Sequence, residues 1–222
     1  MPDSFQIRVC EEPDCGLRYP LVVGQPHGER CPLCLGSTHK ALTHDLPKAG
    51  PERSDNPELK LEALLDNIRS AWNVGAIFRT ADGLGVKRLY LCGITPTPDD
   101  PALKKTALGA EHSLPWEYAR NALHLAEKLK TSNHELVALE QDPRALPLAK
   151  FQTDKTGARS PILVLGNEVT GVDPDLLDLC DHILQIPMLG RKRSLNVEVV
   201  FGIAAFTLSR QFASSVTKPP RD

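Results

Sequence analysis

The chain has 222 residues, 41% of them apolar, which is enough for one domain with a hydrophobic core and a small additional module. Its 26 Lys and Arg against 28 Asp and Glu give a formal charge of -2, so overall charge neither requires nor excludes a nucleic-acid partner. No apolar stretch approaches the roughly 20 residues of a membrane span, and the first four residues do not resemble a secretion signal. We therefore expect a cytoplasmic protein with no membrane association.

The first 34 residues contain four of the six cysteines, arranged as two pairs. This spacing predicts a zinc ribbon in which two turns place four thiolates around one ion, with a strand at 17–23 between them. Four cysteines complete a tetrahedral shell, so the Zn²⁺ is expected to be structural, although free thiols without a metal are the alternative. His27, His39 and His44 are not needed as ligands. The predicted metal ligands are Cys10, Cys15, Cys31 and Cys34.

The remaining cysteines, Cys92 and Cys180, stand alone in apolar surroundings and are expected to be inert core thiols. A polar stretch rich in Pro and Gly follows the ribbon and shows no periodicity, which is typical of a linker. The predicted organisation is a zinc-ribbon module at 1–45, a linker at 46–58, a main domain at 59–215 and a tail at 216–222.

In the main domain, short apolar runs alternate with helical patterns. Strands are predicted at 59–65, 88–94, 135–139, 161–165 and 183–187, and helices at 74–84, 119–130, 175–181 and 195–212. This alternation predicts an α/β domain with a parallel sheet covered by helices on both faces. Ligands of such sheets bind beyond the carboxyl ends of the strands, so the loops there are the candidate site.

The first such loop leads into the helix predicted at 74–84. Asn73 is the expected N-cap and Gly85 the expected C-terminal stop, while the apolar positions of the helix form one buried stripe. Arg79 lies off that stripe. It is either a solvated helix arginine or a clamp for a phosphate or carboxylate beside Asn73.

The second loop follows the strand at 161–165, where Gly166 would allow close backbone approach to a ligand and Glu168 lies in the turn. Neither a dinucleotide-binding fingerprint nor a P-loop fits this sequence. The third loop, at 186–196, carries the basic run at 191–193 and places Ser194 and Asn196 at the start of the last helix. Polar groups there can face an anion or simply cap the helix. The other basic runs, at 104–105 and 218–221, are outside these loops, and short charged runs are usually solvated.

Together the three loops resemble the motifs of the SpoU (TrmH-like) branch of the SPOUT RNA methyltransferases. The matching segments are Asn73-Val-Gly-Ala-Ile-Phe-Arg-Thr-Ala81, Leu165-Gly-Asn-Glu-Val-Thr-Gly171, and Ile186-Pro-Met188 with Ser194-Leu-Asn-Val197. Their order and spacing also agree. The resemblance implies a C-terminal trefoil knot, a homodimer, and methylation of a ribose 2'-hydroxyl in tRNA or rRNA with S-adenosylmethionine.

The resemblance also implies roles for single residues. The backbone at Leu139, Gly166, Ile186, Met188 and Leu195 corresponds to the cofactor site. Substrate placement and chemistry correspond to Asn73, Arg79, Glu168, Ser194 and Asn196.

Arginine is a poor base in water, so Arg79 is expected to clamp a phosphate and stabilise developing alkoxide charge, and a role as base would require unusual desolvation. Glu168 is expected to fix loop geometry, whereas Glu198 departs from the small residue or serine common in similar sequences. The zinc ribbon stands where some relatives carry a substrate-binding extension, so the target RNA of those relatives cannot be transferred to this chain. The competing hypotheses are an inactive RNA-binding or ribosome-assembly factor and a small-molecule enzyme.

Overall fold

The computed structural model describes residues 3–24, 29–46, 60–152 and 159–214, and it divides the chain into two compact units, 1–54 and 55–222. Most of the predicted linker, the predicted tail and His27 lie outside the described residues. Within the described ranges, no helix combines the length and apolar character required to cross a membrane.

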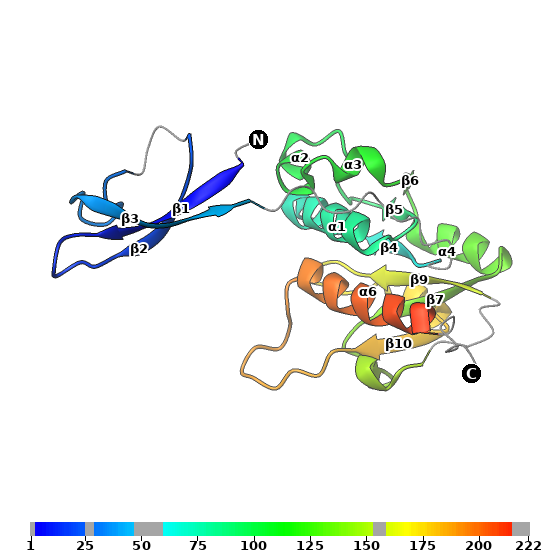
Figure 1. Cartoon of the computed structure of the whole chain (residues 1–222). Helices are drawn as coiled ribbons and strands as arrows, with labels where there is room; N and C mark the ends of the chain where they lie inside the picture. The colour runs from blue at the N-terminus through cyan, green and yellow to red at the C-terminus, as the bar shows by residue number, and fades with distance from the viewer. Residues whose placement is uncertain (1–2, 25–28, 47–59, 153–158, 215–222) are drawn as a thin grey trace, which may run out of the picture. The chain divides into compact units, whose positions relative to one another are not determined.

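The first unit contains a three-stranded antiparallel sheet in the order β2-β1-β3 (Figure 1). Its strands are β1 (Ser4–Cys10), β2 (Arg18–Val22) and β3 (Thr38–Asp45). The predicted strand at 17–23 is confirmed as β2, whereas β1 and β3 were not predicted. Their side chains are mostly exposed or half-buried, because so small a sheet buries little apolar surface.

The second unit is built on a seven-stranded sheet in the order β6-β5-β4-β9-β7-β10-β8, in which every pair of neighbouring strands is parallel. The strands are β4 (Glu62–Asp66), β5 (Leu89–Cys92), β6 (Trp116–Ala119), β7 (His134–Leu139), β8 (Leu146–Pro147), β9 (Ser160–Leu165) and β10 (His182–Gln185). The parallel α/β architecture predicted from the sequence is confirmed.

Helices cover both faces of this sheet. They are α1 (Ala71–Leu84), α2 (Pro101–Ala107), α3 (Ala110–Ser113), α4 (Ala122–Thr131), η1 (Leu148–Lys150), α5 (Pro174–Leu179) and α6 (Val197–Ser214). One apolar core joins α1, α2, α3 and α6 to the strands, and a second core joins α4 and α5 to the opposite face. Successive strand side chains alternate between the two cores, with Ala63 and Leu65 in the first and Leu64 in the second.

Helix α1 begins at Ala71, three residues before its predicted start at 74. Ser70 is the N-cap, because its hydroxyl accepts a hydrogen bond from Asn73 N at 3.3 Å, so the assignment of Asn73 as the cap is wrong. Gly85 ends the helix as predicted, with a left-handed φ of 73° and its N–H bonded to the Ala81 carbonyl. The predicted apolar stripe is buried, while Arg79 on the other side of the helix is exposed.

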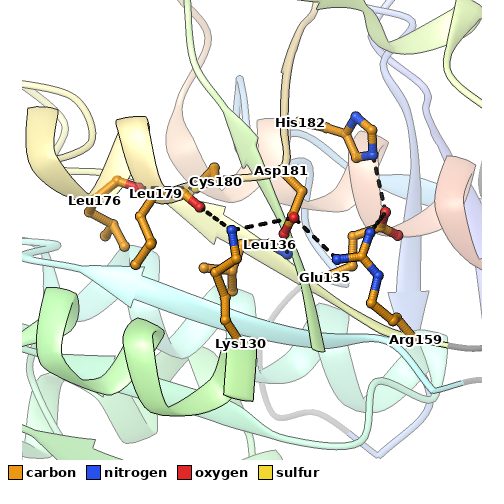
Figure 2. A network of polar contacts seen from close by, with 9 residues as sticks. All are labelled: Lys130, Glu135, Leu136, Arg159, Leu176, Leu179, Cys180, Asp181 and His182. Atoms are coloured by element: carbon orange, nitrogen blue, oxygen red, sulfur yellow. Dashed lines mark hydrogen bonds and ion pairs between the residues drawn. The ribbon is translucent and has the colours of Figure 1, made fainter. Parts of the chain in front are cut away.

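Ion pairs connect the amino ends of β7, β9 and β10 (Figure 2). Arg159 contacts both Glu135 and Asp181 at 3.1 Å, His182 contacts Glu135 at 3.1 Å, and Lys130 contacts Asp181 at 3.3 Å. Asp181 also accepts a hydrogen bond from Leu136 N at 2.9 Å. These contacts join three strands that are distant in sequence, so ion pairs stabilise the strand order at this edge of the sheet.

Candidate functional site

A cavity of about 620 Å³ lies at the opposite, carboxyl edge of the sheet. Its walls are the loops that follow β7, β9 and β10 and the first turn of α6. Eight of the ten predicted site residues line it: Leu139, Gly166, Glu168, Ile186, Met188, Ser194, Leu195 and Asn196. The second and third loops therefore form one site, which contains all five residues that the resemblance assigns to the cofactor.

The loop after β9 is a tight turn that folds back on Gly166. Asn167 and Gly171 exchange backbone hydrogen bonds of 3.0 and 2.9 Å, and the Asn167 side chain donates to the Asn67 carbonyl at 2.7 Å. A Cβ on Gly166 would lie 2.0 Å from Val172 N. Glycine is therefore required here by the chain's own backbone, whether or not a ligand also approaches it.

Glu168 ties this turn to the amino end of α1. Its carboxylate accepts hydrogen bonds from Arg69 N at 2.8 Å, Ser70 N at 3.1 Å and Asn73 Nδ2 at 2.8 Å. Burial alone would raise the pKa of Glu168, but these donors outweigh it and leave the pKa below its usual value. Glu168 is therefore an ionised carboxylate that holds the loop in place, and it is poorly suited to accept a proton.

Asn73 and Arg79, the two predicted site residues of α1, are not among the residues that line the cavity. Asn73 is connected to the cavity by the hydrogen bond from its side chain to Glu168. Arg79 is exposed, and among the described residues it makes no ion pair or hydrogen bond. The structure thus leaves the Arg79 guanidinium open to an external anion without placing it at the cavity of its own chain.

Ser194 and Asn196 both reach the cavity from the segment before α6, which begins at Val197 and not at the predicted Leu195. Among the described residues, neither side chain makes a hydrogen bond. This argues against simple helix capping as their role. Glu198 lies in the first helical turn, where its negative charge suits the helix dipole, and this accounts for a residue that the family motif does not explain.

Two cavity residues after β7, Glu140 and Gln141, were not predicted from the sequence. Glu140 accepts a hydrogen bond from Val172 N at 2.9 Å, and the Gln141 side chain donates to the Arg193 carbonyl. They connect the loop after β7 to the other two loops. Their position at the carboxyl end of a buried strand could have identified them as site residues from the sequence.

The four cysteines of the first unit form a cluster. Cys10 and Cys34 sulfurs lie 3.4 Å apart, Cys15 and Cys31 sulfurs 3.6 Å apart, and all four lie within 4.8 Å of one another. Tetrahedral zinc with Zn–S bonds of about 2.3 Å places its sulfurs about 3.8 Å apart, so the geometry fits a metal ion. Backbone N–H groups of Cys34 and Leu33 lower the pKa of Cys31 to about 7, while burial raises the pKa of Cys10 to about 12.

Cys92 and Cys180 belong to the second core. Burial raises the pKa of each thiol to about 12, so both remain protonated and unreactive at neutral pH. This agrees with the prediction that they are core thiols.

Three similarities to known proteins support a common origin for the main domain. The chain is 31% identical over 168 residues to the 23S rRNA (guanosine-2'-O-)-methyltransferase RlmB of Pseudomonas syringae, covering 76% of this chain and 64% of that protein. It is 31% identical over 156 residues to the tRNA (guanosine(18)-2'-O)-methyltransferase of Thermus thermophilus, covering 68% and 75%. An S-adenosylmethionine-bound rRNA methyltransferase structure from Sinorhizobium meliloti is 26% identical, with a TM-score of 0.62 over 68% of this chain and 56% of that chain.

The similarity to RlmB spans just under two thirds of that protein's length. The sequence profile of the SpoU rRNA methylase family matches residues 60–206, which include all three motifs and every element from β4 to the middle of α6. The α/β fold with a parallel sheet, predicted from the alternation of strand and helix patterns, is also that of the solved relatives. The chain therefore belongs to the SpoU rRNA methylase family.

Proposed function

We propose that this protein transfers a methyl group from S-adenosylmethionine to a ribose 2'-hydroxyl of tRNA or rRNA. The observation that carries this proposal is the cavity at the carboxyl edge, in which Ser194 and Asn196 face residues of the β7 and β9 loops. Family membership and the relatives named as rRNA and tRNA 2'-O-methyltransferases support the same activity.

The residues around the cavity fit S-adenosylmethionine. A volume of about 620 Å³ lies within the range of about 300–1,000 Å³ that small-molecule sites occupy. Leu139 and Leu165 give it a buried apolar floor, and the loop at 186–195 supplies backbone polar groups and the Met188 side chain. When bound, this group supplies a methyl on a positively charged sulfur that a nucleophilic oxygen can attack.

The chain's own residues have to hold the ribose and favour loss of its hydroxyl proton to solvent water. Ser194 and Asn196 can hydrogen-bond the ribose or an adjacent phosphate, and this fixes the hydroxyl oxygen for an in-line approach. Arg79 supplies a positive charge for the phosphate and for the alkoxide that develops on the ribose. Glu168 keeps the α1 end and the β9 loop together, so it positions the other groups.

The position of Arg79 supports a homodimer in which one chain supplies Arg79 to the site of the other. Arg79 does not line its own cavity. The adjoining helix α6 exposes an apolar stripe formed by Val199, Ile203 and Phe206, at 40, 40 and 54% exposure. Such a stripe on a helix suits burial against a second copy of the chain.

Mixing two inactive variants tests this arrangement. If Arg79 acts across the dimer, combining Arg79→Ala with Ser194→Ala subunits restores up to about a quarter of the activity, because half of the dimers are mixed and each has one complete site. If Arg79 acts within its own chain, every site carries at least one change and no activity returns. Size-exclusion chromatography with light scattering measures the dimer itself.

For the first unit we propose a structural zinc ion held by Cys10, Cys15, Cys31 and Cys34, on the basis of the sulfur geometry described above. Elemental analysis of the purified protein should find one zinc per chain, and Cys31→Ser should release it. Zinc content unchanged by this substitution would contradict the assignment. We propose that the ribbon helps to grip structured RNA, so the same variant should weaken RNA binding more than S-adenosylmethionine binding.

The activity is tested with S-adenosylmethionine carrying a tritiated methyl group, incubated with bulk tRNA and with rRNA. We expect label in RNA, and we expect the enzyme to work in the cytoplasm. The second candidate, an inactive RNA-binding or ribosome-assembly factor, predicts RNA binding without label. A small-molecule enzyme predicts no salt-dependent RNA binding.

A further inference from the structure

An exposed tryptophan lies next in sequence to Asn73, whose side chain contacts Glu168 of the candidate site. Trp72 is the second residue of α1, immediately before Asn73, and 55% of its surface is exposed. Lys105 of α2 places its ammonium group 6.0 Å from the centre of the Trp72 ring. The second tryptophan of the chain, Trp116, is 37% exposed on the edge strand β6, and neither tryptophan lines the cavity.

The pairing of Trp72 with α2 is fixed by the backbone. The Thr106 hydroxyl donates a hydrogen bond to the Trp72 carbonyl at 3.0 Å. Gly75, on the same helix, is so close to α2 that an added Cβ would lie 2.2 Å from the Leu103 carbonyl oxygen. Leu103 and Ala107 anchor α2 in the first core, and the two helices lie side by side in Figure 1. The indole is therefore held on a rigid base although it faces solvent.

Two relations place Trp72 where RNA must pass if the proposed function is correct. Asn73 donates to Glu168, which lines the cavity, so Trp72 is one residue from a side chain in direct contact with the site. Arg79 follows Trp72 by seven residues, or almost two helical turns. The two side chains therefore point in directions that differ by about 20°, and they are about 10 Å apart along the helix axis. Trp72 and Arg79 thus lie on one exposed stripe of α1. Because Arg79 is proposed to serve the partner's site, this second relation places Trp72 on the RNA-binding surface of the dimer, and only the first relates it to the cavity of its own chain.

The chemistry of this surface fits one nucleotide of a single strand. An exposed indole offers a flat apolar face on which any base can stack, and a lysine beside it offers a charge for the phosphate. Lys104 and Lys105 are both exposed on α2. We propose that Trp72 stacks an unpaired base of the substrate RNA next to the nucleotide being methylated, with Lys105 on its phosphate. The proposal rests on the RNA methyltransferase function and identifies a positioning residue for it.

Tryptophan fluorescence tests the proposal, because the chain contains two tryptophans and the Trp116→Phe variant leaves Trp72 as the sole emitter. Titration of that full-length variant at low salt with an oligoadenylate of about ten nucleotides should quench the emission. The quenching midpoint should match the binding midpoint from anisotropy of the same labelled oligonucleotide. An abasic ribose-phosphate oligomer of the same length should quench little.

Variants in the otherwise unchanged chain separate stacking from a structural role. Trp72→Ala should raise the KM for RNA about tenfold or more, Trp72→Phe should recover much of that loss, and Lys105→Ala should weaken binding and its salt dependence. Affinity for S-adenosylmethionine should stay unchanged in all three. Trp116→Ala, which removes the other exposed indole, should leave the KM for RNA as it was.

Several results would overturn the proposal. RNA that binds without quenching Trp72, or equal quenching by the abasic oligomer, would show that no base stacks there. Trp72 emission that does not change when RNA is added, but shifts in wavelength when the protein is diluted, would show that a second copy of the chain covers Trp72. Failure of the proposed function is read separately, as absent methyl transfer or absent S-adenosylmethionine binding in the unmodified protein.

Discussion

The two edges of the seven-stranded sheet are both polar, but their polar groups are used differently. At the amino edge, Glu135, Asp181 and their basic neighbours contact one another and join three strands. At the carboxyl edge, the side chains of Ser194 and Asn196 make no hydrogen bond to the described residues, and they face a cavity. Groups that satisfy each other stabilise the fold, whereas groups left open can bind a ligand.

Glu168 lies at the carboxyl edge, but its carboxylate is paired like the charged groups of the amino edge. It accepts hydrogen bonds from Arg69, Ser70 and Asn73 of the same chain. The comparison therefore predicts three kinds of variant. Changes to open groups should affect activity alone, changes to paired groups should affect stability alone, and changes to Glu168 should affect both.

The largest effect is expected from Arg79→Ala. Loss of a positive charge that stabilises the developing alkoxide should lower the rate of methyl transfer about 100-fold or more, while the free energy of unfolding stays unchanged because the side chain is exposed. Rates with labelled cofactor and urea denaturation measure the two quantities. The control is Arg88→Ala, which removes a half-buried arginine paired with Glu117 and should keep full activity. Near-normal turnover of Arg79→Ala would refute its role.

Glu168→Gln should have an intermediate effect on both properties. A glutamine has one acceptor oxygen, so the N–H groups of Arg69 and Ser70 and the Asn73 amide can no longer all be satisfied. We expect methyl transfer to fall about tenfold through looser loop geometry, and the free energy of unfolding to fall by about 1 kcal/mol. A pH–rate profile that loses its acidic limb in this variant would instead indicate a base.

Asp181→Asn should affect stability alone. The amide oxygen can still accept from Leu136 N, but the charge facing Lys130 and Arg159 is lost. Because these side chains are partly exposed, we expect a loss of about 1 kcal/mol in the free energy of unfolding, measured with urea. Methyl transfer should be unchanged, and a rate loss as large as that of Glu168→Gln would break the distinction between the two edges.

The same residue gives a small pH effect with a definite sign. Burial would raise the pKa of Asp181, but the hydrogen bond from Leu136 N and the charges of Arg159 and Lys130 outweigh it and lower the pKa. A lowered pKa in the folded state stabilises the protein above the ordinary carboxyl pKa of about 4, and this contribution is lost as pH falls through the folded value. The stability gap between wild type and Asp181→Asn should therefore be full at pH 7 and shrink in acid. A gap that grows in acid would contradict the sign.

Much of the carboxyl edge could be predicted from the sequence, because the buried strands β4, β5, β7 and β9 contain apolar runs, β10 contains the shorter run Ile183-Leu184, and the motifs follow β4, β9 and β10. Strand β6 was missed because Trp116, Glu117 and Tyr118 are all exposed and give no alternating pattern. Helix α2 was missed although Asp100 and Pro101 are a usual helix start, since seven residues give too little periodicity.

The amino edge could not be predicted. Arg159, Asp181 and Glu135 are brought together by the strand order, with β7 between β9 and β10, and nothing local in the sequence specifies that order. The true N-cap was missed for a related reason. Both Ser70 and Asn73 are good caps, and the contacts of Glu168 with Arg69 and Ser70 set where α1 begins.

The central claim is that the open groups of the carboxyl edge serve ribose methylation, and the nucleoside that receives the methyl group tests it most directly. RNA labelled by the purified protein with tritiated S-adenosylmethionine should be digested to nucleosides and separated. The account predicts that the label appears in a 2'-O-methylnucleoside and disappears with Arg79→Ala. Label on a base, or RNA that binds but is never labelled, would contradict it.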